Sequence, residues 1–499
     1  MKIYKPDLIL SIGITLFLCL ACPVGSVAQP KVEQKDKPTT ALEEVVVVGT
    51  RRKERLAADL AVPVDVISRL ELGAQGNSNI LDTLTSILPS YNVNPEAISD
   101  AATLIRPVSF RGLPADSTLV LLNGKRRHKG AVIGELVNGI NKGAQSVDLY
   151  PLPGIGLKQV EVLRDGAAAQ YGSDAIAGVI NFVLEDDPDI ARLNIQYGAS
   201  YAGDGDNLAL SGVFGTHLGQ TGFATVAFEI KDAEPNSRGS QDPAAQTLVD
   251  AGNTAVADPV VIWGSPEVKN DYKFVFNAAV EAGDSELYGF GNWSTREVEG
   301  SFFWRNPNTR GAVFSDGAGN ILVADLTANG TGNCPVIPVV NGIADPTALT
   351  ALAADPDCFS FNEIFPGGFT PRFGGVVNDS SIVGGFRGEW NNRISYDISV
   401  SAGRNKIDYR ITNTINASLG PDTPLEFDLG TQIQFENIFN ADFSTPVDVG
   451  AASDLNVAFG MQYFEETFQM IARDPQSYVV GAFTAQGFGW KGDTDKLIS

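Results

Sequence analysis

The sequence predicts a small α+β domain followed by an antiparallel β-sheet that crosses a membrane as a barrel. As far as about residue 185, strand patterns alternate with tight turns and a short Ala-rich segment, as in one compact mixed domain. From Asp186 onward, amphipathic strands with a two-residue period recur, and no helical period competes with them. Their connections are alternately short and long, which is the arrangement that transmembrane barrels require.

The clearest strand of the second part is 394–403. Its even positions are apolar and its odd positions are polar or Gly, so one face suits lipid and the other suits water. The even set is Ile394, Tyr396, Ile398, Val400 and Ala402, and the odd set is Ser395, Asp397, Ser399, Ser401 and Gly403. A similar alternation recurs at Leu193–Tyr197, Ala224–Ile230, Tyr272–Ala282 and Leu455–Tyr463.

About nine strands can be placed after residue 185. They lie near 192–200, 207–216, 222–231, 271–282, 286–296, 379–390, 394–412, 427–440 and 454–472. The connections at His217–Thr221, Gly283–Ser285 and Asn391–Arg393 are tight, whereas 232–270 and 297–378 are long and polar. Candidates for aromatic girdles at the membrane surfaces are Tyr288, Trp293, Trp390 and Tyr396, although each could equally be ordinary packing.

The composition is acidic, with 36 Lys and Arg residues against 59 Asp and Glu residues and a formal net charge of −23, which argues against a nucleic-acid partner. Catalysis also has little support. His128 and His217 are the only histidines, and no Cys/His metal spacing or Walker-type loop is present. We therefore predict neither enzyme activity nor a metal or cofactor. His128 ends the basic run Lys125–His128 and is expected in a solvated loop, with a metal site as the alternative.

The amino terminus has the pattern of an exported protein. Lys2 and Lys5 precede a 13-residue apolar run, Leu8–Leu20, which is too short to span a bilayer but fits a signal peptide. Small residues at Ser26–Ala28 predict cleavage before Gln29, so residues 1–28 are expected to be removed. Acylation at Cys22 is the alternative, and Cys19 argues against it. Residues 29–42 are polar and are expected to form a flexible arm.

Three strands stand out in the first domain. Thr118–Leu122 is apolar and is followed by Asn123-Gly124, a strong hairpin signal. Lys158–Arg164 alternates polar and apolar residues, which predicts a half-buried strand that ends at Asp165-Gly166. Ile176–Leu184 is mostly apolar and suits a strand covered on both faces.

Residues 106–126 (RPVSFRGLPADSTLVLLNGKR) and 160–181 (VEVLRDGAAAQYGSDAIAGVIN) together resemble the two halves of the plug domain of TonB-dependent outer-membrane receptors, over about 75 residues. The resemblance implies a plug at 52–185, followed at 186–499 by the N-terminal portion of a transmembrane barrel in the Gram-negative outer membrane. Tight turns would then be periplasmic and long loops extracellular. His128 could lie at the ligand-facing plug apex. The motif positions are Arg111, Gly112, Asn123, Gly124, Arg164, Asp165, Gly166, Tyr171, Gly172, Gly178 and Asn181.

Residues 43–51 resemble a TonB box, the segment that the TonB protein grips from the periplasm. Four valines bounded by acids and a glycine would pair with an exposed sheet edge by strand addition. An ordinary first strand of the plug is the alternative. The box residues are Glu43, Glu44, Val45, Val46, Val47, Val48, Gly49 and Thr50, and the implied partners are TonB with ExbB and ExbD.

By this resemblance, the protein imports a scarce, bulky small-molecule nutrient, such as a ferric siderophore or an oligosaccharide, while its barrel contacts outer-membrane lipid. A non-transporting surface protein or a decayed or partial receptor is the alternative. Arg111 and Arg164 match plug arginines that face barrel glutamates, for which Glu229 and Glu281 are candidates. Nine strands fall short of the about 22 that can enclose a plug, so the chain is expected to be truncated at its C-terminal end.

The long segment 297–378 holds Cys334 and Cys358, the only cysteines after the predicted cleavage site. In an oxidising compartment they are expected to form a disulfide, which would contribute about 3 kcal/mol, with two free thiols as the alternative. The segment is also rich in Phe and Arg. Such a loop could capture ligand or could pack against itself, and the candidate contacts are Trp304, Arg305, Phe369 and Arg372.

Overall fold

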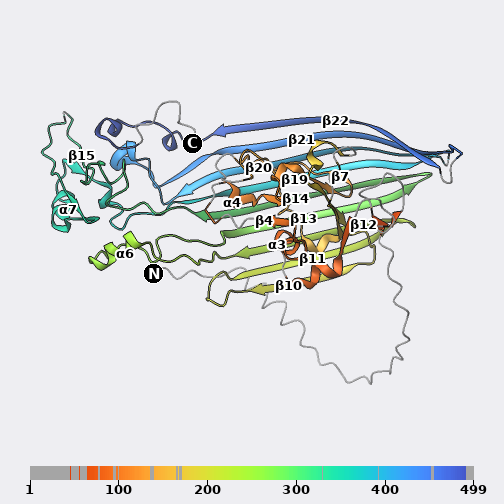
Figure 1. Ribbon diagram of the computed structural model, residues 1–499, viewed down its shortest axis with the longest axis horizontal. Coiled ribbons are helices and arrows are strands. Elements are labelled where there is room, and N and C mark those ends of the chain that lie inside the picture. The colour runs from red at the N-terminus through yellow and green to blue at the C-terminus, as the bar shows by residue number, and fades with distance from the viewer. Residues whose placement is uncertain are drawn as a thin grey trace, which may run out of the picture. The chain divides into compact units, whose positions relative to one another are not determined.

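The computed structural model contains an N-terminal domain and a nine-stranded sheet within one compact unit, residues 44–499 (Figure 1). The structure describes residues 45–46, 55–56, 64–76, 79–93, 97–98, 101–134, 140–164, 167, 171–328, 330–391, 393–450 and 454–489. The predicted signal peptide (1–28) and arm (29–42) lie outside the described residues. No described helix is long and apolar enough to cross a membrane.

A five-stranded sheet forms the centre of the N-terminal domain. Its order is β3 (Val64–Ser68), β8 (Leu157–Leu163), β9 (Gly178–Leu184), β6 (Thr118–Leu122) and β7 (Lys125–Arg126). Among these five strands, β6 and β9 pair in parallel and the other neighbours pair antiparallel. The predicted hairpin is present, since Asn123 and Gly124 both have positive φ and join β6 to the antiparallel β7.

Short elements surround this sheet. A capping box formed by Ser68 and Glu71 begins α2, and the Asn79 side chain caps α3. The remaining elements are α2 (Arg69–Ala74), α3 (Ile80–Ile87), α4 (Ala102–Ile105), β4 (Tyr91–Val93), β5 (Val108–Phe110), and the 3₁₀ turns Ala115–Ser117, Gly154–Gly156 and Ser173–Ala175. Two further short strands, β1 (Val45–Val46) and β2 (Arg55–Leu56), pair with each other.

The strand β8 is buried on both faces over Val160–Leu163, whereas Lys158 is exposed and Gln159 is half-buried, so the prediction of a half-buried strand was wrong for the second part of the strand. Val160 and Val162 lie in the domain core as expected, but Glu161 on the opposite face is also fully buried. It is tolerated there because Asn181 Nδ2 donates a 3.0 Å hydrogen bond to its carboxylate. The core also contains Val275, Phe290 and Val383 of the large sheet. The domain and the large sheet therefore share one apolar core.

We call the nine-stranded sheet the wall. All neighbouring strands pair antiparallel in chain order, which confirms the nine predicted strands. Within the described residues, the edges of the wall are its first and last strands. The strands are β10 (Ala191–Gly198), β11 (Asn207–Leu218), β12 (Gly222–Ala233), β13 (Glu267–Ala282), β14 (Ser285–Ser301), β19 (Arg372–Trp390), β20 (Ile394–Thr412), β21 (Glu426–Val447) and β22 (Leu455–Ala472).

The two faces of the wall differ as the alternation predicts. On β12, Thr225 and Glu229 are buried on the inner face against the N-terminal domain, whereas Val226 and Ile230 are exposed on the outer face. Trp293 and Trp390 also lie on the outer face and are exposed. Tyr288 was predicted to belong to an aromatic girdle on the outer face, and this prediction was wrong. Tyr288 packs against the shared core, and its hydroxyl donates to Asp397.

The connections separate into two ends. Residues 219–221, 283–284 and 391–393 form tight turns at one end. Residues 234–266, 302–371 and 413–425 form long loops at the other end, and carry α6 (Pro243–Asp250), α7 (Pro346–Ala353), β15 (Ala324–Asp325), β16 (Val339–Val340), β17 (Ile343–Ala344), β18 (Cys358–Phe359) and two 3₁₀ turns, Phe361–Glu363 and Ala417–Asp422 (Figure 1). Two more 3₁₀ turns, Pro475–Ser477 and Ala482–Gln486, follow β22.

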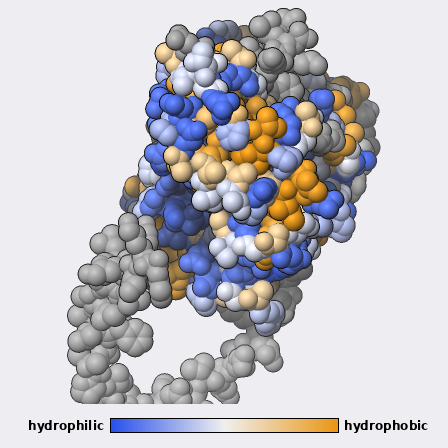
Figure 2. Space-filling view, turned by 90° about the vertical axis from the view of Figure 1, so that its left-hand side faces the viewer, coloured by the Kyte–Doolittle hydropathy of each residue, from blue (hydrophilic) through white to orange (hydrophobic). Residues whose placement is uncertain are grey.

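The loops at this end pack together into one cap. Phe314, Phe361 and Phe369 come from 302–371, Ala417 from the next loop, and Phe488 from the segment after β22, and all five lie in one buried cluster. Figure 2 shows this end as a largely polar surface with apolar patches near its centre. The loops are thus a folded unit with a core of its own.

Candidate functional site

The segment Asn123–Tyr150 makes most of the polar contacts between the N-terminal domain and the wall. We call it the anchor segment. It leaves the domain sheet at the turn after β6, and beyond β7 its described residues form only an isolated bridge between Ile133 and Gln145. Its side chains and backbone groups therefore remain available for the inner faces of β13, β14, β19, β20 and β21.

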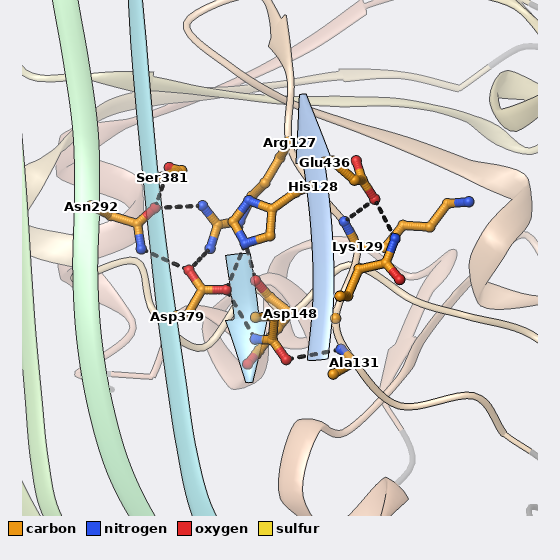
Figure 3. A network of polar contacts seen from close by, with 12 residues as sticks. Arg127, His128, Lys129, Ala131, Asp148, Asn292, Asp379, Ser381 and Glu436 are labelled. Atoms are coloured by element: carbon orange, nitrogen blue, oxygen red, sulfur yellow. Dashed lines mark hydrogen bonds and ion pairs between the residues drawn. The ribbon is translucent and has the colours of Figure 1, made fainter. Parts of the chain in front are cut away.

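Asp379 of β19 is the centre of the contact. Its carboxylate accepts hydrogen bonds from Arg127 Nη2 at 2.8 Å and from Asn292 Nδ2 at 2.8 Å, and it bonds His128 Nε2 at 2.8 Å (Figure 3). Asn405 Nδ2 donates a further bond at 3.0 Å. The side chains of Arg127 and Asp379 are each 1% exposed, and that of His128 is 4% exposed.

This geometry corrects the expectation that His128 lies in a solvated loop. A carboxylate only accepts hydrogen bonds, so His128 presents a protonated Nε2 to Asp379. Four donors surround the two oxygens of Asp379. A buried charge is tolerated when it is paired and hydrogen-bonded in this way, and removal of either partner is costly.

Backbone groups of the anchor segment are held by wall side chains. The Lys129 amide donates to Glu436 Oε1 at 2.9 Å, and the Ala131 amide donates to Asn405 Oδ1 at 2.8 Å (Figure 3). Gln145 Nε2 donates to Gln434 Oε1 at 3.0 Å. The hydrogen bonds from the two backbone amides hold the main chain itself. They therefore position the segment independently of its side chains.

A second buried cluster holds the end of the segment. Asp148 accepts a 2.8 Å bond from Arg296 Nη2 of β14, and the Tyr150 ring lies between the Arg296 guanidinium, 4.5 Å from its centroid, and the Lys273 ammonium, 4.2 Å from it. Lys273 in turn pairs with Glu229 at 2.6 Å and with Asp271 at 3.3 Å. These cation–π and ionic contacts tie the N-terminal domain to three neighbouring wall strands.

The hypothesis that Arg111 and Arg164 pair with Glu229 or Glu281 was wrong. Arg111 donates to the backbone carbonyls of Arg164 and Ala177, and Arg164 pairs with Asp65, so both remain within the domain. Arg111 has a φ of 55°, a left-handed conformation, within the turn that follows β5. Glu229 already has Lys273.

The other motif residues hold the domain together. Asn123 Oδ1 accepts from the Leu184 amide and Asn181 Oδ1 from the Gly124 amide, each at 2.8 Å. Gly178 has a φ of 152°, and a Cβ there would lie 2.4 Å from the Leu163 carbonyl, so glycine is required. The motif is therefore mainly structural. Asp165 and Gly166 lie outside the described residues.

The segment that resembles a TonB box is described only at Val45–Val46. These two residues form β1, which pairs antiparallel with Arg55–Leu56 of the same chain. Six of the predicted box residues lie outside the described residues, namely Glu43, Glu44, Val47, Val48, Gly49 and Thr50.

In the long loop, Cys334 and Cys358 are joined by a disulfide. Phe369 is buried in the cap core, which supports loop packing over ligand contact for this residue. Trp304 Nε1 donates to the Gly367 carbonyl, and Arg372 begins β19. Burial lowers the pKa of the Arg305 guanidinium, and the nearby charge of Arg310 lowers it further.

The N-terminal domain is docked by buried charges against the inner face of an antiparallel sheet of nine strands. Residues 57–179 match the family model of the TonB-dependent receptor plug domain. The vitamin B12 transporter BtuB of Photobacterium profundum is 28% identical over 191 residues, which cover 38% of this chain and 28% of that protein. BtuB of Vibrio vulnificus is 30% identical over 138 residues, which cover 28% of this chain and 20% of that protein.

A crystal structure of a mutant ferric enterobactin receptor, PfeA, from Pseudomonas aeruginosa in complex with enterobactin has the same fold, with a TM-score of 0.50 at 15% identity. The match covers 84% of this chain and 51% of that chain, so the chain spans about half of that structure. Together with the fold, the match over residues 57–179 shows that the chain carries a plug domain of the TonB-dependent receptor type. We therefore call its N-terminal domain the plug.

Proposed function

We propose that this chain forms the plug and part of the barrel wall of an outer-membrane receptor that imports a scarce, bulky nutrient with energy delivered by TonB, acting with ExbB and ExbD. The observation that carries the proposal is the docking of the plug against the inner wall through Asp379 and Arg296. The plug covers the inner face of the wall, so passage along that face requires the plug to move. Export by a signal peptide at 1–28 completes the proposal.

The order of the contacts suggests where movement begins. A pull on residues 43–51 reaches β1 and β2 first, which share only two residue pairs. It then reaches β3, an edge strand that pairs over five residues with β8. The anchor segment follows only after these. Its polar groups can exchange wall partners for water as the site opens, which keeps the cost of detachment finite.

The names of the relatives and the resemblance of the plug indicate the class of nutrient. The relatives are named as vitamin B12 transporters and the structural match as a ferric enterobactin receptor, so a bulky metal chelate and an oligosaccharide both remain candidates. Trp304, Arg305 and Arg372 are the proposed contacts, because they lie at the loop end of the wall and are not in the cap core.

Val46→Pro tests the TonB box. Proline removes a backbone donor and breaks strand addition, so the affinity of the full-length receptor for the purified periplasmic domain of TonB should fall at least about tenfold, the equivalent of one or two lost hydrogen bonds. Isothermal titration calorimetry in detergent measures this. Val46→Thr, which keeps the donor and the β-branched shape, should bind as wild type.

Two outcomes would contradict the proposal. Equal TonB affinity for Val46→Pro and wild type would show that the box lies elsewhere. A wild-type receptor that does not bind TonB would favour the non-transporting surface protein.

A further inference from the structure

The outer face of the wall has a sharp border between apolar and polar side chains. On β20, the outward residues run from Ile394 to Ala402, and Arg404, Lys406 and Asp408 follow. On β22, the outward run Leu455–Tyr463 gives way to Glu465. The register places the two borders one step apart, because Ala402 pairs with Asn437 and Asn437 with Glu465. An apolar band of this kind marks the bilayer, so the border marks the start of the head groups.

An open cavity of about 250 Å³ lies directly above this border on the same face. A row of cross-strand neighbours, Trp293, Ser380 and Arg404, forms its lower side, and the pair Asn378 and Lys406 lies one step further toward the loops. Side chains in such pairs lie about 5 Å apart, so all five converge on one space. Asp379 also lines the cavity, but its carboxylate lies on the inner face with Arg127.

The cavity is positively charged. In the described part of the chain, Arg404 has no ion-pair partner. Lys406 shares Asp408 with Arg473, and Thr431 also donates to that carboxylate. The two cations of the cavity, Arg404 and Lys406, therefore have one paired carboxylate between them, and Arg473 and Thr431 also bind that carboxylate. The hydroxyl of Ser380 and the amide of Asn378 add neutral donors, and this set is suited to the oxygens of a phosphate group.

On the same outward face, the apolar band contains a pair of glycines beyond Ile382. Gly289 of β14 and Gly384 of β19 pair directly, four residues further toward the tight turns than Trp293 and Ser380. A Cβ at Gly384 would meet nothing within 4 Å. Exposed Leu287, Phe386 and Val400 surround the pair. Paired glycines on an exposed strand face leave room for another molecule to approach the backbone.

We propose that this cavity binds the phosphate group of an anionic glycolipid of the outer leaflet, with an acyl chain against the apolar band near Gly289 and Gly384. The proposal rests on the outer-membrane location proposed above. Lipid is favoured over free phosphate because the charged cavity directly adjoins the apolar band on the same face, at the height where a head group meets its acyl chains.

Native mass spectrometry of the full-length receptor in nanodiscs tests the site, with diphosphorylated lipid A as the probe. Wild type should retain bound lipid, and the double variant R404Q/K406Q should retain it at least about tenfold less, since two charge-assisted contacts are lost. Lipid A stripped of its phosphates should bind wild type as weakly as phosphorylated lipid binds the double variant. Millimolar inorganic phosphate should not compete.

Two variants serve as controls. Arg410→Gln removes an outward arginine of the same strand that is paired with Glu426 and lies outside the cavity, so it should retain lipid. Arg404→Lys keeps the charge and should retain most of it. Equal retention by wild type and R404Q/K406Q, or competition by free phosphate, would overturn the proposal. Val46→Pro should retain lipid as wild type does, which separates this result from the test of TonB coupling.

Discussion

The two parts of the plug are held in opposite ways. In the sheet formed by β3, β8, β9 and β6, fully buried Val160, Val162 and Phe182 supply the stability, and apolar burial of this kind is lost only when the sheet itself opens. In the anchor segment, Arg127 instead pairs with a carboxylate of the wall, and Asp148 pairs with a guanidinium of the wall. Polar contacts of this kind are strong while buried and are replaced by water once separated. The plug sheet is therefore held by apolar burial, whereas the anchor segment is held to the wall by buried polar contacts beside the apolar packing of Ala131 and Val132.

The largest effect is expected in the plug sheet. Phe182→Ala should cost about 4 kcal/mol, because it removes a fully buried ring from the core shared with the wall. Hydrogen exchange measured by mass spectrometry should then be about a thousandfold faster in peptides of β8 and β9, and unchanged in β20 and β21. Phe182→Leu should show less than about tenfold acceleration. A response to Phe182→Ala below tenfold would mean that the plug sheet does not depend on this core.

Asp379→Asn should destabilise the anchor segment. It leaves the buried Arg127 without a counter-charge and should cost about 3 kcal/mol. Exchange should rise about a hundredfold at 125–132 and remain unchanged in β8 and β9. Asp186→Asn, which removes an exposed pair with Lys158, is the matched control and should change exchange by less than about fivefold. Acceleration in β8 and β9 instead would show that the two parts are not independent.

Gly403→Ala should give the smallest effect. A Cβ at Gly403 would lie 2.4 Å from the His128 ring, so the anchor segment must shift by a few tenths of an ångström or more, at a cost of about 1 to 2 kcal/mol. Exchange at 125–132 should rise about tenfold. Gly384→Ala, on the neighbouring strand with open space at its Cβ, should behave as wild type. Equal effects of the two alanines would mean that the His128 contact does not hold the segment.

The wall was largely predictable from sequence, although its loop-side ends were not. All nine strands were placed, because outward apolar residues alternate with inward polar ones wherever the wall faces lipid. Beyond the apolar band the pattern reverses, because inward Val268, Val377 and Ile407 lie in a buried apolar cluster while outward residues are mostly polar, and the hydrogen-bonded ladder continues. For this reason β19 begins at Arg372 and β13 at Glu267, earlier than the predicted residues 379 and 271.

The plug contacts were not predictable in the same way. Motif residues such as Asn181 located the domain, but Arg127 and Asp379 are separated by 252 positions, and no local pattern pairs them. The basic run that contains His128 has the composition of a solvated loop, and only the distant carboxylate makes its burial possible. The sign of the charges is also reversed at one of the two clusters, since Arg296 of the wall meets Asp148 of the plug, whereas Arg127 and Asp379 have the expected signs.

The cap at the loop end has a consequence for engineering. Its core draws Phe314 and Phe361 from one loop, Ala417 from a second and Phe488 from the segment after β22. Replacement of any one loop would expose the apolar side chains that the other two contribute, and exposed patches of this kind promote aggregation. Grafts that aim to change ligand preference must therefore exchange the three segments together. Antibodies raised against a linear peptide from 302–371 would find few of the phenylalanines of that peptide accessible on the folded protein.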